Sequence, residues 1–524
     1  MAMHIAQILR QPALRWPRRT AVVDCLATGV PQRSWTYAEL DAAARKVAAV
    51  LVGAGLSPGD RVALFAENGA DFIAGWFGIA NAGLCVVPVP LASAVPEVVH
   101  RLQHADCAAL LVDASRKALA ERAIAQTPHI HHLDLAAAVH GPHAALPAPI
   151  DPPPEAPALL LYTSGTTGLA RGAALSHASL LLHTTSCSQH HLRLTRRDKV
   201  LGVLPMTHSF GLRQGIFAPF LVGATTYAMA RFDAAASLAL MHSVGITWVP
   251  AVPTMFAAWA NLPESPPPSA LRWCLSAGAP LPDDVCLRAE KRLGAPVRQG
   301  FGMTEATFCT MNSPPGPRIV GSVGRPTWGI EVRVVDAQGQ DVATGTDGEV
   351  CFRGHNVMTG YWRDERATQD AMPDGWLRSG DIGHVDADGC LWVTDRKKDL
   401  ILVGGHNVYP SEVEAALCSH PAVAEVAVVG RPDPLYGEAV VAAIVRREGM
   451  ALDAAAVTAW AAERVARFKI PREVVFLEAM PMGASGKVQK RALRDLLAAG
   501  AVKAEPASAP APAAPPAAAA SPRG

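Results

Sequence analysis

The segment best suited to chemistry is the run LYTSGTTGLARG, in which an apolar stretch ends in hydroxyl and glycine residues. Glycine lets the main chain approach a ligand closely, and backbone amides together with hydroxyls can bind a polyphosphate. The residues suited to this role are Thr163, Ser164, Gly165, Thr166, Thr167 and Gly168. An unliganded polar turn has the same composition, so the loop alone leaves both interpretations open. The ending of a Walker loop is missing, because Leu169, Ala170 and Arg171 follow, which disfavours a P-loop kinase.

Several later motifs accompany this loop, and together they resemble the adenylate-forming superfamily, the AMP-dependent synthetases and ligases that include acyl-CoA synthetases, luciferases and adenylation domains. The motifs are QGFGMTEA, LSAGAPL, LRSGDIG, TDRKKDLI and PMGASGKVQKRAL, and the resemblance extends from Ser34 to Leu496. In the family a proline and a lysine follow the glycine-rich loop. Ala170 and Arg171 occupy those places here, and Arg171 keeps the positive charge in a wider, forked group.

The resemblance implies a nucleotide site assembled from distant parts of the chain. Asp381 and Arg396 would hold the ribose hydroxyls, and Thr304 would hydrogen-bond the α-phosphate. Glu305 would bind Mg²⁺, a hard cation that takes oxygen ligands from one or two carboxylates and from substrate phosphates. Taken alone, a glutamate after a glycine turn is more often a solvated charge. The residues facing the adenine would be Gly278, Ala279, Pro280, Gly300, Phe301 and Gly302.

The resemblance also implies a catalytic lysine and a movable C-terminal domain. Lys487 would neutralise the charge that develops when a carboxylate attacks the α-phosphate. Lys398 would be the hinge, and Gly404 and Gly405 would leave room for the pantetheine arm of coenzyme A. His208, in LPMTHSFGL, would lie where the acyl pocket meets the nucleotide, although a lone histidine beside a proline turn is more often structural.

An apolar stretch, ITWVPAVPTMFAAWANL, supplies candidates for the pocket that would receive the acid. They are Trp248, Val249, Val252 and Phe256 from this stretch, with Met303 and Phe308 from the later motif. Neither residues 206–227 nor residues 246–260 contain an Asp or Glu that could pair with a substrate amine. A fatty, alicyclic or aryl acid is therefore favoured over an amino acid, and its chain length stays open.

These parts predict an acid–thiol ligase that uses ATP, Mg²⁺ and coenzyme A. Adenylation of the acid releases pyrophosphate, and the AMP of the acyl adenylate is a good leaving group for a nearby thiol, so no protein nucleophile is needed. Two alternatives stay open. One is an acyl-AMP ligase that loads an acyl carrier protein, and the other is a nonenzymatic acyl or nucleotide sensor, which the change at Arg171 favours only faintly.

The helices and strands that must position these residues are predicted to form an α/β protein of more than one domain. Apolar runs such as RVALFA and CVVPV flank helix-like stretches, and 524 residues exceed the usual size of one domain. We expect a large N-terminal domain of α/β layers over residues 1–395, a hinge at 396–400, a small mobile α+β domain over 401–497 and a disordered Ala/Pro-rich tail over 498–524.

The composition of the chain argues against several classes of binding partner. The chain has 47 basic and 46 acidic residues, so no net field attracts nucleic acid. Its ten cysteines lack paired spacing, which indicates buried reduced thiols. Arginines interrupt the N-terminal region, and no later segment reads as a membrane span. We therefore expect a cytoplasmic enzyme that acts on small molecules and has no integral membrane segment.

Overall fold

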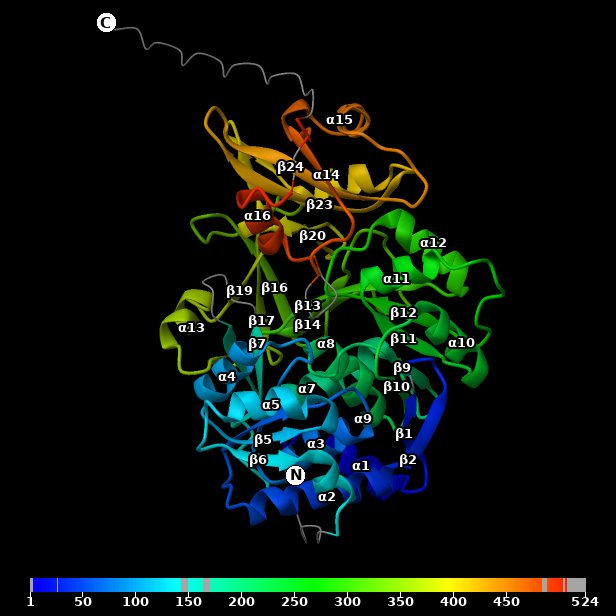
Figure 1. Cartoon of the computed structure of the whole chain (residues 1–524), viewed down its shortest axis with the longest axis vertical. Helices are drawn as coiled ribbons and strands as arrows, with labels where there is room; N and C mark the ends of the chain where they lie inside the picture. Colours follow the sequence, from blue (N-terminus) through cyan, green and yellow to red (C-terminus); the bar gives the residue numbers. More distant parts are fainter. Residues whose placement is uncertain are drawn as a thin grey trace, which may run out of the picture. The chain divides into compact units, whose positions relative to one another are not determined.

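Two compact units make up the chain. The computed structural model describes residues 3–25, 27–142, 149–163, 170–482 and 488–502 and the backbone of 505–506 (Figure 1). The first unit comprises residues 1–345, 350–379 and 385–392, and the second comprises 346–349, 380–384 and 393–524. The second unit thus begins slightly before the expected hinge and includes the short segment that carries Asp381. The predicted α/β fold class, with a large N-terminal and a smaller C-terminal part, is confirmed.

The larger sheet of the first unit has nine strands and a parallel centre. Its order is β15 (Arg325–Pro326), β14 (Thr307–Met311), β13 (Val297–Met303), β12 (Trp273–Ser276), β11 (Trp248–Ala251), β9 (Lys199–Gly202), β10 (Thr225–Met229), β1 (Thr20–Cys25) and β2 (Pro31–Thr36). The loop with Gly278 leaves the carboxyl end of β12, and Thr304 and Glu305 lie in the turn between β13 and β14. Carboxyl ends of parallel strands are where open α/β sheets bind ligands.

A second sheet of this unit carries the glycine-rich loop. Its order is β18 (Gly360–Tyr361), β8 (Arg171–Ser176), β7 (Pro157–Thr163), β4 (Cys85–Pro88), β3 (Arg61–Phe65), β5 (Cys107–Val112) and β6 (His131–Asp134). β7 and β8 form an antiparallel hairpin whose last paired residues are Thr163 and Arg171. The predicted phosphate loop is therefore the connection of this hairpin.

Helices pack on these sheets through small and apolar residues. Thr36 caps α2, since its Oγ1 accepts the backbone N–H of Glu39 and the Glu39 carboxylate accepts that of Thr36. At Gly78 a Cβ would lie 2.5 Å from Val47, so glycine permits the close packing of α2 on α3. The helices of the unit are α1 (Gln7–Arg15), α2 (Tyr37–Gly53), α3 (Ala70–Asn81), α4 (Val95–His104), α5 (Lys117–Ile124), α6 (Leu135–His140), α7 (His177–Ser186), α8 (Ser209–Leu212), α9 (Ala218–Leu221), α10 (Ala234–Val244), α11 (Pro253–Ala260), α12 (Asp283–Leu293) and α13 (Glu365–Ala371), with the 3₁₀ turn η1 (Ala114–Arg116) and the π-helices η2 (Cys187–Leu192) and η3 (Arg213–Phe217).

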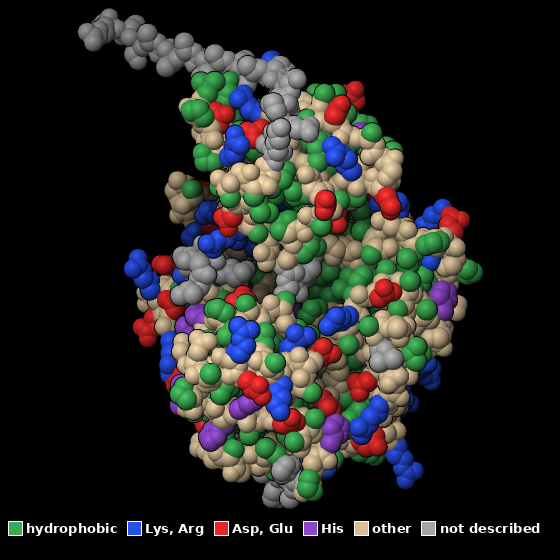
Figure 2. Space-filling model, viewed as in Figure 1, with side chains coloured by type: hydrophobic (Ala, Val, Ile, Leu, Met, Phe, Trp, Pro, Cys, Tyr) green, Lys and Arg blue, Asp and Glu red, His purple; other side chains and the backbone are tan. Residues whose placement is uncertain are grey.

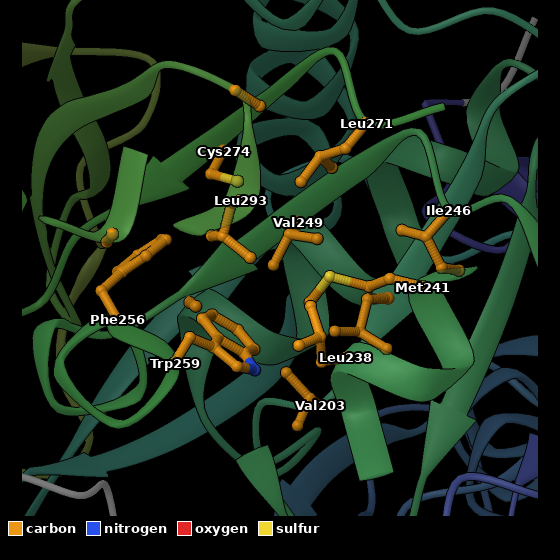
Figure 3. Packing of buried hydrophobic residues seen from close by; sticks show 14 of the residues in the cluster. Val203, Leu238, Met241, Ile246, Val249, Phe256, Trp259, Leu271, Cys274 and Leu293 are labelled. Carbon is orange, nitrogen blue, oxygen red and sulfur yellow. The ribbon is translucent and has the colours of Figure 1, made fainter. Parts of the chain in front are cut away.

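One core of the first unit lies between the nine-stranded sheet and the helices α10, α11 and α12. Val249, Phe256 and Trp259 are fully buried there (Figure 3). The indole of Trp259 donates a 2.9 Å hydrogen bond to Ser237, so its polar atom is satisfied inside the core. This core supports β11 and β12 from the side of the sheet to which Val249 points.

The second unit is built on a six-stranded sheet with its own core. The order is β22 (His406–Val408), β21 (Ile401–Val403), β24 (Gly437–Arg446), β25 (Glu473–Leu477) and β26 (Glu505–Pro506), with β23 (Val423–Asp433) also paired to β24. Its helices are α14 (Pro410–Cys418), α15 (Ala454–Ala462) and α16 (Lys490–Ala498), with the 3₁₀ turns η4 (Lys397–Asp399) and η5 (Arg467–Lys469). The chain passes between the units within a four-stranded sheet, in the order β16 (Ile330–Val335), β17 (Gly348–Gly354), β19 (Leu377–Val385) and β20 (Leu391–Arg396).

The C-terminal tail departs from the prediction at one point. Residues 498–524 were expected to be disordered, but Glu505 and Pro506 pair antiparallel with β25. An edge strand offers unpaired backbone groups to any neighbouring segment, whatever its side chains, and composition does not report this. Residues 507–524 lie outside the described part of the chain.

The charged surface side chains, the cysteines and the helices agree with what the composition predicts. Acidic and basic side chains are interspersed on the face drawn in Figure 2, in keeping with a formal net charge of +1. None of the ten cysteines, all of which lie in the described ranges, forms a disulfide, and all but Cys418 are buried, as expected for buried reduced thiols. Among the described residues, no helix combines the length and apolar character needed to cross a bilayer.

Candidate active site

Arg171 stands at the end of the hairpin that carries the glycine-rich loop. Its Nε lies 3.4 Å from a carboxylate oxygen of Asp364, and its guanidinium lies 5.7 Å from the centre of the Tyr361 ring. Both contacts fix the cation at the first residue of β8, the strand that follows the glycine-rich loop in the chain. Thr163 is half-buried at the opposite strand end, whereas Ser164, Gly165, Thr166, Thr167 and Gly168 lie outside the described residues.

Glu305 is buried and held by its neighbours. The hydroxyl of Tyr361 donates a 2.9 Å hydrogen bond to Oε1 of Glu305, and the Glu305 carbonyl accepts the N–H of Met358 at 2.7 Å. Burial raises the pKa of Tyr361, and the Glu305 charge raises it further, so the phenol stays a donor. Tyr361 thereby connects Glu305 with Arg171, two positions that the sequence motifs treat separately.

The remaining oxygen of Glu305 suits a metal completed by substrate. Among the described residues, Oε2 of Glu305 has no hydrogen-bond partner, and no group of three His, Cys, Asp or Glu side chains could hold a metal. Mg²⁺ commonly takes one or two carboxylates and fills its other positions with water and substrate phosphates. One buried carboxylate with a free oxygen fits that pattern.

The turn that carries Thr304 and Glu305 is strained. Thr307, immediately after it, has φ of 54°, a left-handed conformation that β-branched residues seldom adopt. The amide of Asn356 donates to the carbonyls of Ala306 and Phe308 and clamps both sides of the strained residue. A Cβ at Gly302 would collide with the Thr307 carbonyl, so packing alone requires glycine there. A Cβ at Gly300 would likewise collide with the ring of Phe308. The ring of Phe301 stacks on that of Phe352, with 5.6 Å between the ring centres.

His208 begins the helix α8. Its Nδ1 accepts the backbone N–H of Phe210 at 3.3 Å, which places the proton of a neutral ring on Nε2. His208 therefore caps α8, and its position where the acyl pocket meets the nucleotide stays a prediction. Gly211, in the same helix, touches the segment before His208, since a Cβ there would collide with the carbonyl oxygen of Pro205.

This contact predicts a difference between two glycines of one segment. We expect Gly211→Ala to lower the free energy of unfolding by about 1–3 kcal/mol, because the methyl group overpacks against Pro205. Gly215→Ala is the control, since a Cβ at Gly215 meets no atom within 4 Å. Its expected effect is a gain of at most about 1 kcal/mol. Urea unfolding of both variants checks this, and equal midpoints would contradict the packing argument.

The loop expected to face adenine follows β12. Gly278 has φ of 92°, a value that favours glycine, and Ala279 and Pro280 are exposed. An exposed backbone turn at the carboxyl end of a parallel strand can receive a planar base. The structure thus leaves this loop accessible to a ligand.

The second unit brings the two predicted ribose residues together. Nε of Arg396 lies 3.2 Å from a carboxylate oxygen of Asp381. Asp381 is buried, while about half of the Arg396 side chain is exposed. The pair therefore presents a carboxylate oriented by a cation, a good acceptor for two neighbouring hydroxyls.

The predicted hinge is exposed between two anchored neighbours. Lys397 pairs with Glu349 at 3.0 Å, and Asp399 pairs with Arg494 at 2.8 Å, while Lys398 is exposed. Gly404 and Gly405 form the turn between β21 and β22 with φ of 57° and 84°. Lys487 lies outside the described residues.

The structure corrects the grouping of the acyl-pocket candidates. Successive side chains of a strand point to opposite faces, so Trp248 and Val249 cannot share one cavity. Val249 and Phe256 belong to the core with α10, α11 and α12, whereas Trp248 and Val252 pack in another cluster with Phe308. Met303 is half-buried.

Sequence motifs did not reveal three residues of this region. Tyr361 and Asp364 reach the site because β18 pairs with β8, a long-range contact that no local pattern reports. Arg213, five positions after His208, is buried beside His183, with its Nη2 2.5 Å from Nδ1 of His183. Its position in an apolar run was the only available signal.

Known proteins resemble this chain over nearly its full length. Residues 9–362 match the family profile described as AMP-binding enzyme, and residues 412–487 match that of the AMP-binding enzyme C-terminal domain. The sulfoacetate–CoA ligase of Cupriavidus necator is 35% identical over 500 residues, covering 93% of this chain and 96% of the relative. The indoleacetate–CoA ligase of Aromatoleum aromaticum is 36% identical over 484 residues, covering 89% and 94%. The crystal structure of ATP-bound MatB from Rhodopseudomonas palustris superposes on this structure with a TM-score of 0.88. The two chains are 31% identical, and the match covers 94% of this chain and 99% of that chain.

Proposed function

The chain belongs to the AMP-binding enzyme family and is an acid–thiol ligase of the acyl-CoA synthetase type, and from this premise we propose that it adenylates an acid with an apolar body and transfers the acyl group to coenzyme A. The observation that carries the proposal is the connected set of Arg171, Tyr361 and Glu305 beside the hairpin loop. With the enzyme class established, the sensor alternative falls away.

In the first half-reaction two anions must meet, the substrate carboxylate and the α-phosphate of ATP. Cations and fixed donors at that point lower the barrier because they need not reorganise as charge develops. Arg171 would hold phosphate oxygens, and Thr304 would donate to the α-phosphate. When bound through Glu305, Mg²⁺ would supply further charge neutralisation. Lys487, as the family resemblance implies, would neutralise the charge that develops in this attack.

Support for an apolar acid comes from the cluster around the turn. Trp248, Val252 and Phe308 pack together, and the ring of Phe210 lies 5.4 Å from that of Phe308. An acyl chain or ring would find apolar partners there. No carboxylate in residues 206–227 or 246–260 could pair with a substrate amine.

The acceptor is proposed to be coenzyme A, with an acyl carrier protein as the alternative. Gly404 and Gly405 would let a narrow pantetheine arm pass without side-chain bulk. A panel of carboxylic acids assayed with ATP and Mg²⁺, with coenzyme A or a phosphopantetheinylated carrier protein, decides between them. The proposal expects acid-dependent pyrophosphate release and acyl-CoA. Pyrophosphate release with thioester formed only on the carrier protein would assign the alternative.

Swinging of the second unit about Lys398 predicts unequal effects on the two half-reactions. We expect Lys398→Pro to slow thioester formation more than adenylation, by about tenfold or more, because proline fixes φ and restricts the preceding residue. Lys398→Ala is the control, since it removes only an exposed side chain. Single-turnover rates of each half-reaction check this, and an unchanged thioesterification rate in Lys398→Pro would count against the hinge.

A further inference from the structure

Two histidines of α4 contact both strands of the hairpin that carries the glycine-rich loop. Nε2 of His100 donates a 3.0 Å hydrogen bond to the backbone carbonyl of Ala170, the first described residue after the loop. A carbonyl oxygen can only accept, so the proton lies on Nε2. Nδ1 of His104 lies 2.8 Å from the hydroxyl oxygen of Tyr162, which is on the opposite strand, β7. Both strands of the hairpin are thus held next to the loop that joins them.

The helix α4 can support the hairpin because it is packed on the same two strands. His100 and His104 are one turn apart and share a face of the helix, and their ring centres are 5.4 Å apart. Val98 of α4 is fully buried in a core that also contains Leu160 of β7 and Ala174 of β8. Apolar contacts therefore fix the helix on the hairpin, and the two histidines hold the ends of its strands.

The ring of Tyr162 is enclosed on several sides. Gly172 pairs with Tyr162 across the hairpin, and a Cβ at Gly172 would lie 3.3 Å from the ring. The guanidinium of Arg101 lies 5.7 Å from the ring centre, and the rings of both histidines meet that of Tyr162 edge-on. Burial lowers the pKa of His104 and raises that of Tyr162, so the hydrogen bond between them joins two neutral groups.

The contact made by His100 acts directly on Arg171. The carbonyl that accepts from His100 belongs to the peptide group joining Ala170 to Arg171, so the hydrogen bond fixes the plane from which the Arg171 residue begins. The guanidinium of Arg171 contacts the Asp364 carboxylate and the Tyr361 ring. Arg171 is therefore held at its backbone through α4 and at its guanidinium by two other side chains.

We infer that His100 and His104 are positioning residues for adenylation, which hold the ends of the hairpin strands and so orient Arg171 for the phosphates of ATP. The inference rests on the proposed function, because it takes Arg171 to bind those phosphates. A cation that is already oriented loses less side-chain entropy on binding and need not reorganise as charge develops. Pyrophosphate leaves before the thiol attacks, so the two histidines contribute to the first half-reaction alone.

The experiment compares variants that remove the His100 contact with one that keeps it. His100→Leu removes the donor, whereas His100→Gln keeps an amide N–H near the position of Nε2. We expect His100→Leu to lower kcat/KM for ATP by about tenfold in pyrophosphate release and His100→Gln to restore most of it. KM for the acid, and thioester formation from a presupplied adenylate, should stay at wild-type values. Equal losses in the two half-reactions, or no recovery in His100→Gln, would overturn the inference.

The opposite strand is tested with a second pair of variants. His104→Leu removes the contact with Tyr162, whereas His104→Asn keeps a polar group near the position of Nδ1. We expect the same pattern, a loss confined to adenylation that asparagine reverses. Gln103→Leu is the control, because it places leucine at an exposed position of α4 and should leave both half-reactions at wild-type rates. Wild-type adenylation in His104→Leu, or an equal loss in Gln103→Leu, would contradict the assigned role.

A double-mutant cycle tests whether His100 acts through Arg171. If it does, His100→Leu should cause little further loss of adenylation in an Arg171→Ala background, because the side chain that it orients is gone. Losses that add in the double variant would refute that route.

Binding of ATP distinguishes failure of this inference from failure of the proposed function. If no acid is turned over, the proposed function fails, and calorimetric titration with ATP and Mg²⁺ still tests the histidines. Binding about tenfold weaker in His100→Leu than in the wild type and His100→Gln would support the inference. Equal affinities in the three proteins, or no binding by the wild type, would refute it.

Discussion

Lys487→Ala is expected to abolish formation of the acyl adenylate while sparing thioester formation from a presupplied adenylate. The lysine would neutralise charge that develops only while carboxylate attacks phosphate, so its loss should lower the adenylation rate by about 10²–10³-fold or more. Displacement of AMP by a thiol no longer needs that cation. Acid-dependent pyrophosphate exchange and single-turnover thioesterification measure the two steps separately.

The control for this variant is Arg491→Ala. Arg491 is an exposed cation on α16, the helix that follows Lys487 in the chain, and removing it should leave both half-reactions near wild-type rates. Equal losses in the two half-reactions of Lys487→Ala would refute its assignment to adenylation. Losses of the same size in Arg491→Ala would point to a general effect of local charge.

Glu305→Gln should cause the second large loss. The amide keeps the shape of the side chain and can accept from Tyr361, but it removes the negative charge that would bind Mg²⁺. We expect kcat for adenylation to fall by about 10²–10³-fold and the concentration of Mg²⁺ needed for half-maximal rate to rise. Pyrophosphate release measured across a Mg²⁺ titration checks both parts.

The variant Tyr361→Phe distinguishes the effect of the Glu305 charge from the effect of the orientation of its carboxylate. It keeps the carboxylate of Glu305 and removes only the 2.9 Å hydrogen bond that positions it, so a loss of about tenfold is expected. If Tyr361→Phe equalled Glu305→Gln, orientation rather than charge would be the role of Glu305. If Glu305→Gln left the Mg²⁺ requirement unchanged, the carboxylate would not be a metal ligand.

Local patterns predicted the elements of the site better than its contacts. The apolar stretch that ends in Thr163 leads into the predicted phosphate loop, and it is one strand of a hairpin. Tyr361 could not be predicted, because a two-residue strand places it beside β8 through pairing alone. The grouping of Trp248 with Val249 failed for a local reason, since the alternation of side chains along β11 was not applied.

Arg213 shows why charge is hard to place from sequence. Lys and Arg are almost never fully buried unless paired, so an arginine next to apolar residues is expected to reach solvent. Here the π-helix turns it inward, where Nη2 contacts His183 and, in the described part of the chain, Nη1 has no hydrogen-bond partner. Glu505 and Pro506 differ from expectation for a related reason, since backbone pairing with β25 is independent of composition.

The left-handed backbone at Thr307 limits how this enzyme can be made more heat-resistant. A β-branched residue held at φ of 54° costs about 1–3 kcal/mol, and the amide of Asn356 keeps the turn in that state. Relaxing it would recover stability at the one place where Thr304 and Glu305 must keep their positions. Thermostabilising libraries should therefore leave residues 304–308 untouched and look for gains in helix caps and surface loops.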